Sequence, residues 1–413
     1  MKIAIVGSGI AGNTIAHLLY RQHDITVFEK NSRIGGHSHT HQIELENKQI
    51  NVDTGFIVFN KKTYPLFTNL MDKLGVAYEN SNMSFSVFSE ENNVEYNGTS
   101  INTLFSQRKN IFNVKFLKMI FEIVRFNRQA PKLLNTDVEI SLGAYLSKQR
   151  YSNYFKNYYI LPMGSAIWSS NMQTMLDFPA KFFIQFFHNH GMLSVNNRPQ
   201  WLTITNGSSH YVDKLTQPFK ANIKLNTSIK EITRAKESVN IRYDGIKEQF
   251  DYVFFACHSD EALKLLGDVS LAEHQILSAI PYAENNVVLH TDRSLLPKKK
   301  LSWAAWNYNI DNDLQTPIKL TYNMNILQNI DTVDPLLVSL NSIAQINKNK
   351  ILKTIHYHHP TFTLQAIAAQ KQKNKISGVN RTFYAGAYWG NGFHEDGVKS
   401  AYDAVDQFNH LIA

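Results

Sequence analysis

The spacing of hydrophobic residues changes twice within the first forty positions of this chain. Lys2–Val6 is a short, almost continuous apolar run, which is typical of a buried strand. Apolar residues then recur at helical spacing over 15–19. A second apolar run, Asp24–Phe28, follows and ends at Glu29. The pattern predicts a β-α-β unit at the start of the chain.

Further along, strand-like and helix-like periods alternate. A strand is expected over Asn51–Phe59, interrupted by Gly55, and a helix over Pro65–Leu74. The predicted pattern of elements changes over residues 80–204, where short strands are followed by helices rich in aromatic residues. Residues 223–256 alternate like a small β-meander that closes on a buried strand.

A glycine motif lies between the first strand and the first helix. Gly7-Ser-Gly9-Ile-Ala-Gly12 has the spacing of the dinucleotide fingerprint, in the strand–turn–helix setting that this motif requires. Gly7 permits the tight turn, Gly9 lets backbone approach a pyrophosphate, and Gly12 lets the helix pack on the strand. The helix N-terminus supplies N–H groups for the phosphates. Glu29, 17 residues after Gly12, is placed to accept hydrogen bonds from the adenosine ribose.

The fingerprint alone leaves NAD and FAD open, and the next residues favour FAD. Glu29 is followed by Arg33 and by the pair Gly35-Gly36, an extension that NAD-dehydrogenase units usually lack. An arginine at this place reaches a phosphate, and paired glycines let the chain pass close to a large flat ring. We therefore predict FAD, and a yellow protein would exclude binding of NAD alone.

The last residues of the chain repeat the pattern of its first residues, a strand followed by a glycine-rich turn and a helix. A strand is expected over Arg381–Ala385, then a glycine-rich turn over Gly386–Gly397 and a helix over Val398–Leu411. Together these patterns indicate an α/β fold, a Rossmann-type FAD-binding domain with an inserted α+β substrate domain. We assign 1–79, 205–265 and 376–413 to the FAD-binding domain, and 80–204 and 266–375 to the substrate-binding domain.

Composition narrows the protein class. The chain has 413 residues, enough for two or more domains, and its 43% hydrophobic content is that of a globular protein. One cysteine excludes internal disulfides and a cysteine-based metal site, which fits a reducing compartment. The chain begins on its nucleotide-binding strand, leaving no room for a signal peptide, and no window is apolar enough to span a membrane. We expect a cytoplasmic protein.

The net charge of +8 has two interpretations. Nucleic-acid binding is not expected, because the basic residues are scattered and no recognition motif accompanies them. Residues 112–132, however, interleave apolar and basic side chains, a pattern that fits a helix lying peripherally on the inner face of an anionic membrane. An ordinary surface helix with its apolar face in the core explains the same pattern equally well.

At this point the sequence resembles a known family. The motifs at residues 7–12, 29–36 and 53–55 and the C-terminal glycine-rich turn resemble the flavin-containing amine oxidase and carotenoid desaturase superfamily. Further segments resemble one bacterial branch of predicted NAD/FAD-binding proteins, often found beside methyltransferases similar to cyclopropane-fatty-acid synthases. These segments are Gly36-His-Ser-His-Thr40, Asp53-Thr-Gly-Phe-Ile-Val-Phe-Asn60, Asn189-His-Gly-Met192, Arg198-Pro-Gln-Trp201, Leu301-Ser-Trp-Ala-Ala-Trp-Asn-Tyr308 and Gly386-Ala-Tyr-Trp-Gly-Asn-Gly-Phe-His-Glu-Asp-Gly397.

The resemblance implies FAD-dependent oxidation or desaturation of an unsaturated or methyl-branched fatty acyl chain of membrane lipid. It also implies which residues bind the cofactor. These are Gly7, Ser8, Gly9, Ala11 and Gly12 at the pyrophosphate; Glu29 and Lys30 at the adenosine ribose; Arg33 near the phosphates or ribityl chain; Gly35, Gly36, His37, Thr40, Thr54, Gly55 and Phe56 along the flavin; Ile229 at the adenine; and Gly386, Asp396, Gly397 and Val398 beside the ribityl chain and flavin. Gly397 and Val398 would offer N–H groups at a helix start to the flavin pyrimidine edge.

The sequence departs from the superfamily at two places. The superfamily usually has Gly-Asp where this chain has Gly386-Ala387, and that Asp holds the ribityl chain; Glu395 or Asp396 would have to substitute. The monoamine oxidases attach flavin through a cysteine near the C-terminus, whereas Cys257 lies in a different element. We therefore expect noncovalent FAD.

The candidate catalytic residues are His394 and Glu395, which lie in the turn expected to abut the flavin. Histidine suits proton removal near neutral pH. The alternative is that this turn only caps the last helix, with Asp396 as the capping residue. The alternating His37, His39 and His41 suggest a metal, but no carboxylate or cysteine lies near them in sequence, so no metal is expected.

Other function classes remain beside the acyl-chain oxidoreductase. One is a soluble amine oxidase, which the sequence supports less because the lysine that such enzymes commonly place by flavin N5 is not located. Another is a non-redox flavoprotein, either a double-bond isomerase or a module that binds FAD for structure. We expect the substrate to be a lipid or another hydrophobic small molecule, whereas an amine oxidase would act on a polyamine or an aromatic amine.

Overall fold

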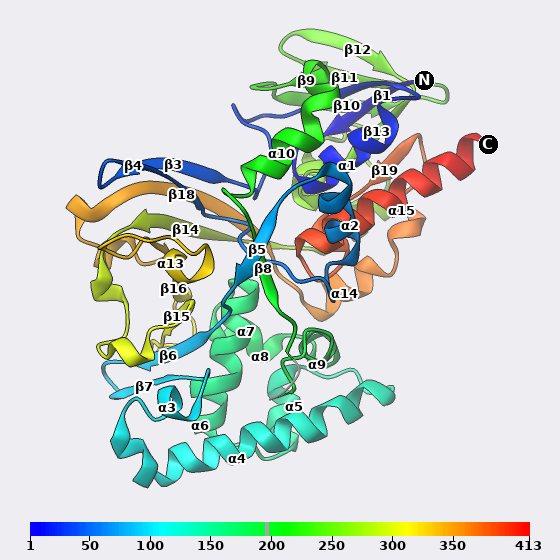
Figure 1. Cartoon of the computed structure of the whole chain (residues 1–413). Helices are drawn as coiled ribbons and strands as arrows, with labels where there is room; N and C mark the ends of the chain where they lie inside the picture. Colours follow the sequence, from blue (N-terminus) through cyan, green and yellow to red (C-terminus); the bar gives the residue numbers. More distant parts are fainter. Residues whose placement is uncertain (195–197) are drawn as a thin grey trace.

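A parallel sheet brings the two ends of the chain together at the upper end of the molecule in Figure 1. The structure is a computed structural model that describes residues 1–194 and 198–413. The sheet has the strand order β19-β13-β1-β2-β9, and every neighbouring pair is parallel. Its strands are β1 (Lys2–Val6), β2 (Asp24–Phe28), β9 (Ile223–Lys224), β13 (Tyr252–Phe255) and β19 (Thr382–Tyr384). The β-α-β unit and the α/β fold class are confirmed.

This sheet is buried on both faces, as the continuous apolar run of β1 requires. Ile3 and Ile5 face a core shared with the helices α1 (Ile10–Leu19) and α15 (His394–Ile412). The alternate residues of β1 face a second core beneath a three-stranded antiparallel sheet. That sheet is the predicted meander and consists of β10 (Ile229–Arg234), β11 (Val239–Tyr243) and β12 (Ile246–Phe250).

A seven-stranded mixed sheet forms the middle of the molecule, with the order β18-β14-β17-β16-β15-β6-β7. Its two longest strands, β14 and β18, run antiparallel and reach the parallel sheet at one end, where Tyr282 stacks on His258 with ring centroids 4.4 Å apart. The strands are β6 (Phe85–Ser89), β7 (Val94–Asn97), β14 (Tyr282–His290), β15 (Trp306–Asn309), β16 (Lys319–Asn323), β17 (Leu337–Leu340) and β18 (Ile351–Pro360).

Two ribbons connect the sheets. One pairs β3 (Thr40–Leu45) with β4 (Lys48–Asp53), and the other pairs β5 (Tyr78–Ser81) with β8 (Trp201–Ile204). The strand predicted over Asn51–Phe59 is wrong beyond Asp53. After Asp53 the chain leaves the ribbon, and at Gly55 it packs closely against another loop. A Cβ on Gly55 would lie 2.1 Å from the carbonyl oxygen of His37, so this close approach requires glycine.

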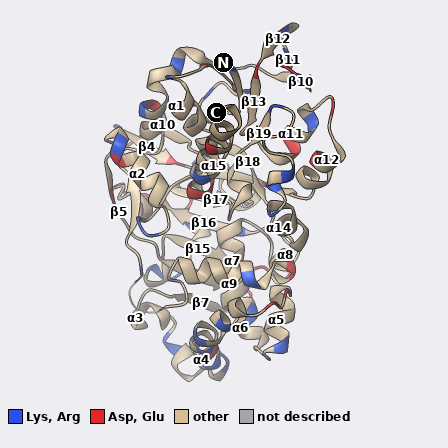
Figure 2. Ribbon diagram, turned by 90° about the vertical axis from the view of Figure 1, so that its right-hand side faces the viewer, with Lys and Arg blue, Asp and Glu red and all other residues tan. Residues whose placement is uncertain are grey.

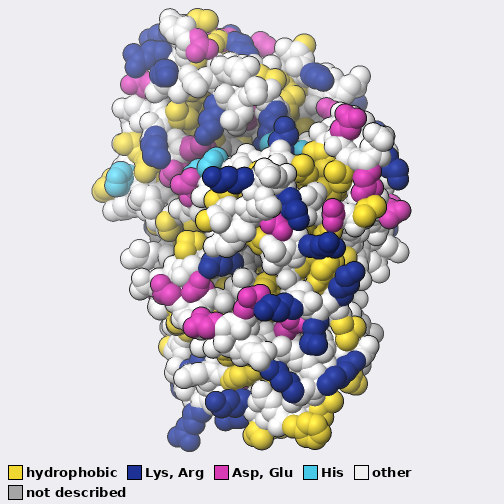
Figure 3. Space-filling view, turned by 90° about the vertical axis from the view of Figure 1, so that its left-hand side faces the viewer, with side chains coloured by type: hydrophobic (Ala, Val, Ile, Leu, Met, Phe, Trp, Pro, Cys, Tyr) yellow, Lys and Arg dark blue, Asp and Glu magenta, His cyan; other side chains and the backbone are white. Residues whose placement is uncertain are grey.

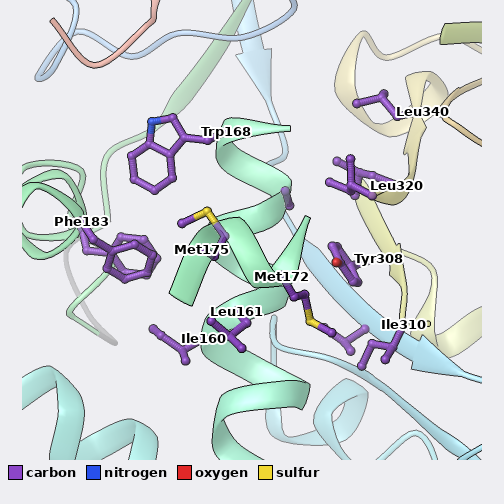
Figure 4. Close-up of a cluster of buried hydrophobic side chains, with 14 of the residues drawn as sticks. Ile160, Leu161, Trp168, Met172, Met175, Phe183, Tyr308, Ile310, Leu320 and Leu340 are labelled. Atoms are coloured by element: carbon purple, nitrogen blue, oxygen red, sulfur yellow. The ribbon is translucent and has the colours of Figure 1, made fainter. Parts of the chain in front are cut away.

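The lower end of the molecule is helical (Figure 1). A large apolar core joins these helices to the seven-stranded sheet, and Trp168, Phe183 and Met175 lie together in it (Figure 4). The helices are α3 (Ile101–Leu104), α4 (Val114–Gln129), α5 (Leu142–Lys148), α6 (Asn153–Phe155), α7 (Leu161–Trp168), α8 (Met172–Asp177) and α9 (Ala180–Asn189).

The remaining helices lie outside this helical region. They are α2 (Pro65–Leu74), α10 (Ser209–Thr216), α11 (Ser259–Leu265), α12 (Leu271–Ser278), α13 (Met324–Leu327) and α14 (Leu364–Gln370). Short 3₁₀ segments are η1 (Arg108–Phe112), η2 (Ala130–Asn135), η4 (Gln217–Asn222), η5 (Arg293–Leu295), η6 (Lys300–Ser302), η7 (Ile343–Gln345), η8 (Lys348–Lys350), η9 (Lys373–Lys375) and η10 (Ala387–Trp389), and η3 (Lys156–Ile160) is a π-helical turn.

Each of the three segments assigned to the FAD-binding domain contributes a strand to the parallel sheet, while the domain boundaries themselves stay a prediction. Lys and Arg positions are spread along the ribbon of the whole molecule (Figure 2), as their scatter in the sequence indicates. In the described parts of the chain, none of the helices combines the length and the hydropathy of a membrane span.

Candidate active site

The glycine motif forms a tight turn between β1 and α1. Gly7 has a φ of +102°, and a Cβ there would lie 3.0 Å from the carbonyl oxygen of Ala256, at the end of β13. A Cβ on Gly12 would lie only 2.0 Å from the carbonyl oxygen of Gly7. A Cβ on Gly9, in contrast, would meet nothing within 4 Å, and no described side chain caps the N-terminus of α1. The turn therefore leaves open space and free N–H groups at the start of the helix.

The second glycine pair packs directly on this turn. Gly36 has a φ of +58°, and a Cβ there would lie 3.0 Å from the Cα of Gly9. The N–H of Gly35 donates to the carbonyl oxygen of Ser8 over 2.9 Å. Arg33 reaches back to this loop, since its Nη2 donates to the carbonyl oxygen of Gly36 over 2.7 Å. The two glycine motifs form one backbone surface, and Arg33 holds the loop that carries the second.

Residues 54–56 form the next layer. Gly55 packs against the backbone of His37, and the N–H of Phe56 donates to the His37 carbonyl oxygen over 2.8 Å. The N–H of Thr54 donates to the carbonyl oxygen of His39 over 3.0 Å. The structure thus brings together three separate sequence motifs, at residues 7–12, 29–36 and 53–55.

Glu29 is buried at the end of β2, and both of its carboxylate oxygens have partners. One accepts from the N–H and the hydroxyl of Ser8, at 3.0 and 2.7 Å. The other accepts from the N–H and the side-chain amide of Asn31, at 2.9 and 2.8 Å. Asn31 was not singled out from the sequence. Lys30 is exposed and pairs with Glu261.

The segment before β10 lies beside this acidic residue. The N–H of Thr227 donates to the carbonyl oxygen of Glu29, and that of Asn226 to the carbonyl oxygen of Asn31, both over 3.0 Å. Ile229, expected at the adenine, begins β10 two residues later and is half-buried. This location is compatible with an adenosine end of the site at residues 29–31 and 226–229.

Thr40 has a partner that the sequence did not reveal. Its hydroxyl donates to the buried carboxylate of Asp53 over 2.6 Å. The N–H and hydroxyl of Ser208 and the side-chain amide of Gln328 donate to the same carboxylate, at 2.7 to 3.0 Å. Burial raises the pKa of Asp53, while these hydrogen bonds lower it. The network ties the ribbon β3–β4 to α10 and α13, so it positions residues 37–40.

The C-terminal helix begins earlier than predicted. The sequence indicates a turn over Gly386–Gly397, but α15 starts at His394, because the carboxylate of Asp396 accepts from the N–H of Phe393 over 2.9 Å and closes the first helical turn. The N–H of Gly397 consequently donates to the carbonyl oxygen of Phe393 inside the helix. The expectation that the Gly397 N–H is free for the flavin edge is therefore wrong. In an α-helix starting here, the first-turn N–H groups are those of His394, Glu395 and Asp396.

The start of α15 nevertheless abuts the glycine turn. A Cβ on Gly397 would lie 2.7 Å from a side-chain carbon of Ile10. Val398 is buried in the core that contains Phe56. Gly386 has a φ of +153°, and its N–H donates to the hydroxyl of Ser400 over 2.8 Å. Two helix N-termini, those of α1 and α15, thus meet at the same place.

The two candidate catalytic residues have structural partners. His394 is buried, and its Nε2 lies 2.9 Å from the Ser38 hydroxyl and 3.0 Å from that of Tyr211. Burial lowers the pKa of His394 to about 3. The carboxylate of Glu395 accepts from the N–H groups of Leu66 and Phe67, at 3.0 and 2.9 Å, and so caps α2. Their catalytic role stays a prediction, which these contacts do not favour.

A cluster of histidine and tyrosine side chains lies where β18 reaches the loop after Gly36. The ring of Tyr357 stacks on His37 with centroids 4.8 Å apart, and His359 lies 5.3 Å from the same ring. The hydroxyl of Tyr357 lies 3.0 Å from the Thr54 hydroxyl and 3.1 Å from Nδ1 of His39. Sequence reasoning missed Tyr357, since nothing in the spacing of β18 relates it to residues 37–54.

Burial governs the charge of this cluster. It lowers the pKa of His39 to about 3 and that of His359 to about 4, and it lowers that of His37 well below its usual value. These rings are therefore neutral near pH 7. The Nε2 of His37 is buried and has no hydrogen-bond partner among the described residues. Within the described ranges, no set of three His, Cys, Asp or Glu side chains is arranged to hold a metal ion.

Comparison with known proteins identifies the family. Residues 10–324 match the sequence profile of the flavin-containing amine oxidoreductases. The chain belongs to this family. It is therefore an FAD-dependent oxidoreductase of the amine oxidase type, as the glycine motifs predict. None of the curated proteins compared matches this chain in sequence.

Several solved structures share the fold of this chain at low sequence identity. A putative protoporphyrinogen oxidase from Exiguobacterium sp. 255-15 is 15% identical, with a TM-score of 0.70 over 100% of this chain and 98% of its own. Cyclohexylamine oxidase from Brevibacterium oxydans IH-35A is 13% identical, with a TM-score of 0.68 over 100% and 99%. A fatty acid isomerase from P. acnes that produces CLA is 14% identical, with a TM-score of 0.66 over 98% of both chains.

The residues of this flavin-containing amine oxidoreductase fit FAD. The space beside Gly9, the uncapped start of α1 and the unpartnered Nε2 of buried His37 each leave room or hydrogen-bonding capacity for a bound group. When bound, FAD supplies hydride-acceptor chemistry. The substitute expected for the missing Asp at position 387 is not evident, because Glu395 caps α2 and Asp396 caps α15.

Proposed function

We propose that this FAD-dependent oxidoreductase oxidises or desaturates an unsaturated or methyl-branched fatty acyl chain of membrane lipid, by hydride transfer to flavin N5. We further propose that it meets this lipid at the inner face of the membrane, through residues 112–132. The cofactor carries the redox chemistry. The protein then has to bind the acyl chain, hold it beside the cofactor and exclude water.

One observation carries the acyl-chain proposal. The segment that leads into α15 is walled by aromatic side chains from the helical region. The ring of Phe393 stacks on Phe186 with centroids 5.1 Å apart, and the ring of His190 stacks on Phe186 with centroids 3.8 Å apart. Trp168 donates from its indole nitrogen to the carbonyl oxygen of Asn391 over 3.2 Å. A wall of this composition suits an apolar chain.

The charges at the same turn favour a neutral substrate over a cationic amine. Its two carboxylates, on Glu395 and Asp396, already accept backbone N–H groups. Burial raises the pKa of both groups. Burial also lowers the pKa of His190, to about 4, so this ring is neutral near pH 7. None of the aromatic side chains of the wall supplies an anion for an ammonium group.

The similarity to the fatty acid isomerase lends support, because that protein's name links the same fold to a fatty acid. It also favours a second candidate function, a flavin-dependent double-bond isomerase with no net oxidation. The similarity to cyclohexylamine oxidase keeps the amine oxidase as a third candidate.

We propose that FAD is bound noncovalently. Cys257, the single cysteine, comes two residues after the end of β13, and its backbone nitrogen would lie 3.1 Å from a Cβ on Gly7. It thus lies behind the glycine turn, at the pyrophosphate end of the expected site. Burial raises the pKa of its thiol, which disfavours the reactive thiolate.

The test is anaerobic incubation of the yellow protein with phospholipids that carry monounsaturated or methyl-branched chains, dispersed in detergent. We expect the flavin absorbance to bleach and the lipid acyl chain to lose two hydrogens by mass spectrometry. An acyl chain of unchanged mass with a moved double bond would establish the isomerase instead. Bleaching by putrescine or cyclohexylamine alone would establish the amine oxidase.

A further inference from the structure

The helix α4 exposes an apolar row on the side opposite to its core contacts. Val114, Leu117, Phe121 and Val124 have exposed fractions of 77, 42, 69 and 52%. Their spacing of three and four residues places them along one face. The buried residues Phe116, Met119, Glu122 and Phe126 lie on the opposite face. A helix on the surface of a soluble protein normally presents polar residues there.

The row continues beyond the helix. Phe112, at the end of η1, is 87% exposed, and Ile101, at the start of α3, is 79% exposed. Figure 3 shows hydrophobic side chains gathered with Lys and Arg at the bottom end of the molecule, the end that α4 forms in Figure 1. Exposed apolar patches rimmed by basic residues are typical of interaction sites.

Basic side chains flank the apolar row. Between Ile101 and Lys132, the basic residues are Arg108, Lys109, Lys115, Lys118, Arg125, Arg128 and Lys132. The single acidic residue of this stretch, Glu122, is buried, and its carboxylate accepts from the N–H and hydroxyl of Ser152. In the described part of the chain, Lys109, Lys115 and Lys118 take part in no ion pair. Their charges are therefore available to an anionic partner.

A groove of about 890 Å³ opens beside this row. The same three lysines line it, together with Asn113 at the N-cap of α4 and Tyr154 and Tyr158 from the neighbouring segment. None of the described side chains that line it is acidic. Lysine ammonium groups, asparagine amides and tyrosine hydroxyls all donate hydrogen bonds to phosphate oxygens. The groove therefore suits a phosphate next to an apolar surface.

We infer that α3, η1 and α4 dock on an anionic phospholipid bilayer, with the apolar row inserted among the acyl chains and the groove lysines on headgroup phosphates. Charge complementarity selects this partner, because an inserted apolar row rimmed by unpaired lysines matches the layered structure of such a membrane. The inference gives a residue-level form to the membrane contact in the proposed function, but it does not depend on which bond is oxidised.

The experiment is cosedimentation of the FAD-loaded protein with vesicles. Vesicles that contain phosphatidylglycerol in phosphatidylcholine are compared with vesicles of phosphatidylcholine alone. We expect binding to the anionic vesicles, weakened by added salt. Lys115→Gln with Lys118→Gln should lower the partition coefficient about 30-fold. Phe112→Ser with Phe121→Ser should lower it at least about tenfold.

Matched variants at the other parts of the surface act as controls. Lys236→Gln with Lys247→Gln makes the same charge change on exposed residues of the β10–β12 region, and Leu271→Ser with Val333→Ser removes two other exposed apolar side chains. Both pairs should leave vesicle binding unchanged. Equal losses in control and test variants would overturn the inference, as would the absence of binding to anionic vesicles.

Two further results would also overturn it. If inorganic phosphate at constant ionic strength abolishes binding and the Phe112/Phe121 variant binds normally, the groove is a site for free phosphate rather than part of a membrane surface. If the Lys and Phe variants bind vesicles normally but no longer capture a lysate protein that the wild type captures, the surface serves a protein partner. Oxidation of detergent-dispersed lipid is measured separately, so docking and the proposed reaction can fail independently.

Discussion

The rings of Phe56 and His394 lie face to face, with centroids 3.6 Å apart and an angle of 14° between their planes. This contact joins the loop after β4 to the first turn of α15, so two segments at opposite ends of the sequence share one wall of the candidate site. The packing excludes water from the histidine, and burial accordingly lowers its pKa to about 3.

This burial predicts a pH effect on stability. His394 is neutral in the folded protein, whereas the unfolded chain takes up a proton below pH 6.5. Its contribution is therefore complete above pH 6.5 and is lost as the pH falls towards 3, by about 1.4 kcal/mol for each pH unit. Urea unfolding of the wild type and of His394→Gln should show free energies of unfolding that converge or cross as the pH falls. Parallel curves would contradict the neutral, buried histidine.

Glu395 is predicted to stabilise rather than to catalyse. Glu395→Ala removes both acceptors from the N-terminus of α2 and should lower the free energy of unfolding by about 1–2 kcal/mol. Glu395→Gln keeps one acceptor and should lose about half as much. The rate at which an accepted substrate reduces the flavin should be unchanged in the Gln variant. A rate loss of about 100-fold with unchanged stability would instead restore the role of a catalytic acid or base.

Substitutions at two glycines of the β1–α1 turn should separate an effect on FAD binding from an effect on folding. Gly9→Ala places a Cβ in open space, so thermal unfolding of the apoprotein should be unchanged while FAD affinity falls at least about tenfold. Gly12→Ala places a Cβ 2.0 Å from a carbonyl oxygen and should lower the free energy of unfolding itself by about 3 kcal/mol. Flavin titration and calorimetry of the apoproteins measure the two effects. A Gly9 variant that binds FAD normally would place the pyrophosphate elsewhere.

Asp53 is predicted to be the structural anchor of the ribbon β3–β4. Asp53→Ala leaves the donors of Thr40, Ser208 and Gln328 unpaired inside the protein, which should cost about 3 kcal/mol of unfolding free energy or more. Asp313 offers a matched control, because it also accepts a backbone N–H but lies on the surface. Asp313→Ala should change stability by no more than about 0.5 kcal/mol. Similar losses in both variants would contradict the network.

The sequence determined the local framework of the site. The glycine spacing, the apolar runs on either side and the acidic strand end predicted the β-α-β unit and its dinucleotide, because these features depend on backbone geometry within about thirty residues. The family match confirms FAD. The amphipathic pattern of residues 112–132 also predicted a helix, but it did not tell which apolar face is buried.

Tertiary structure decided which side chains meet. Tyr357 reaches His37 only because β18 pairs with β14 and ends beside the parallel sheet, a pairing between segments far apart in the sequence. The role of Glu395 likewise depends on tertiary contacts, since it caps α2 at Phe67, 328 residues away in sequence, whereas Asp396 closes the first turn of its own helix. The cap that Glu395 supplies to α2, the burial of His394 and the choice of which face of α4 stays exposed result from contacts between distant segments, and periodicity along one segment does not specify them.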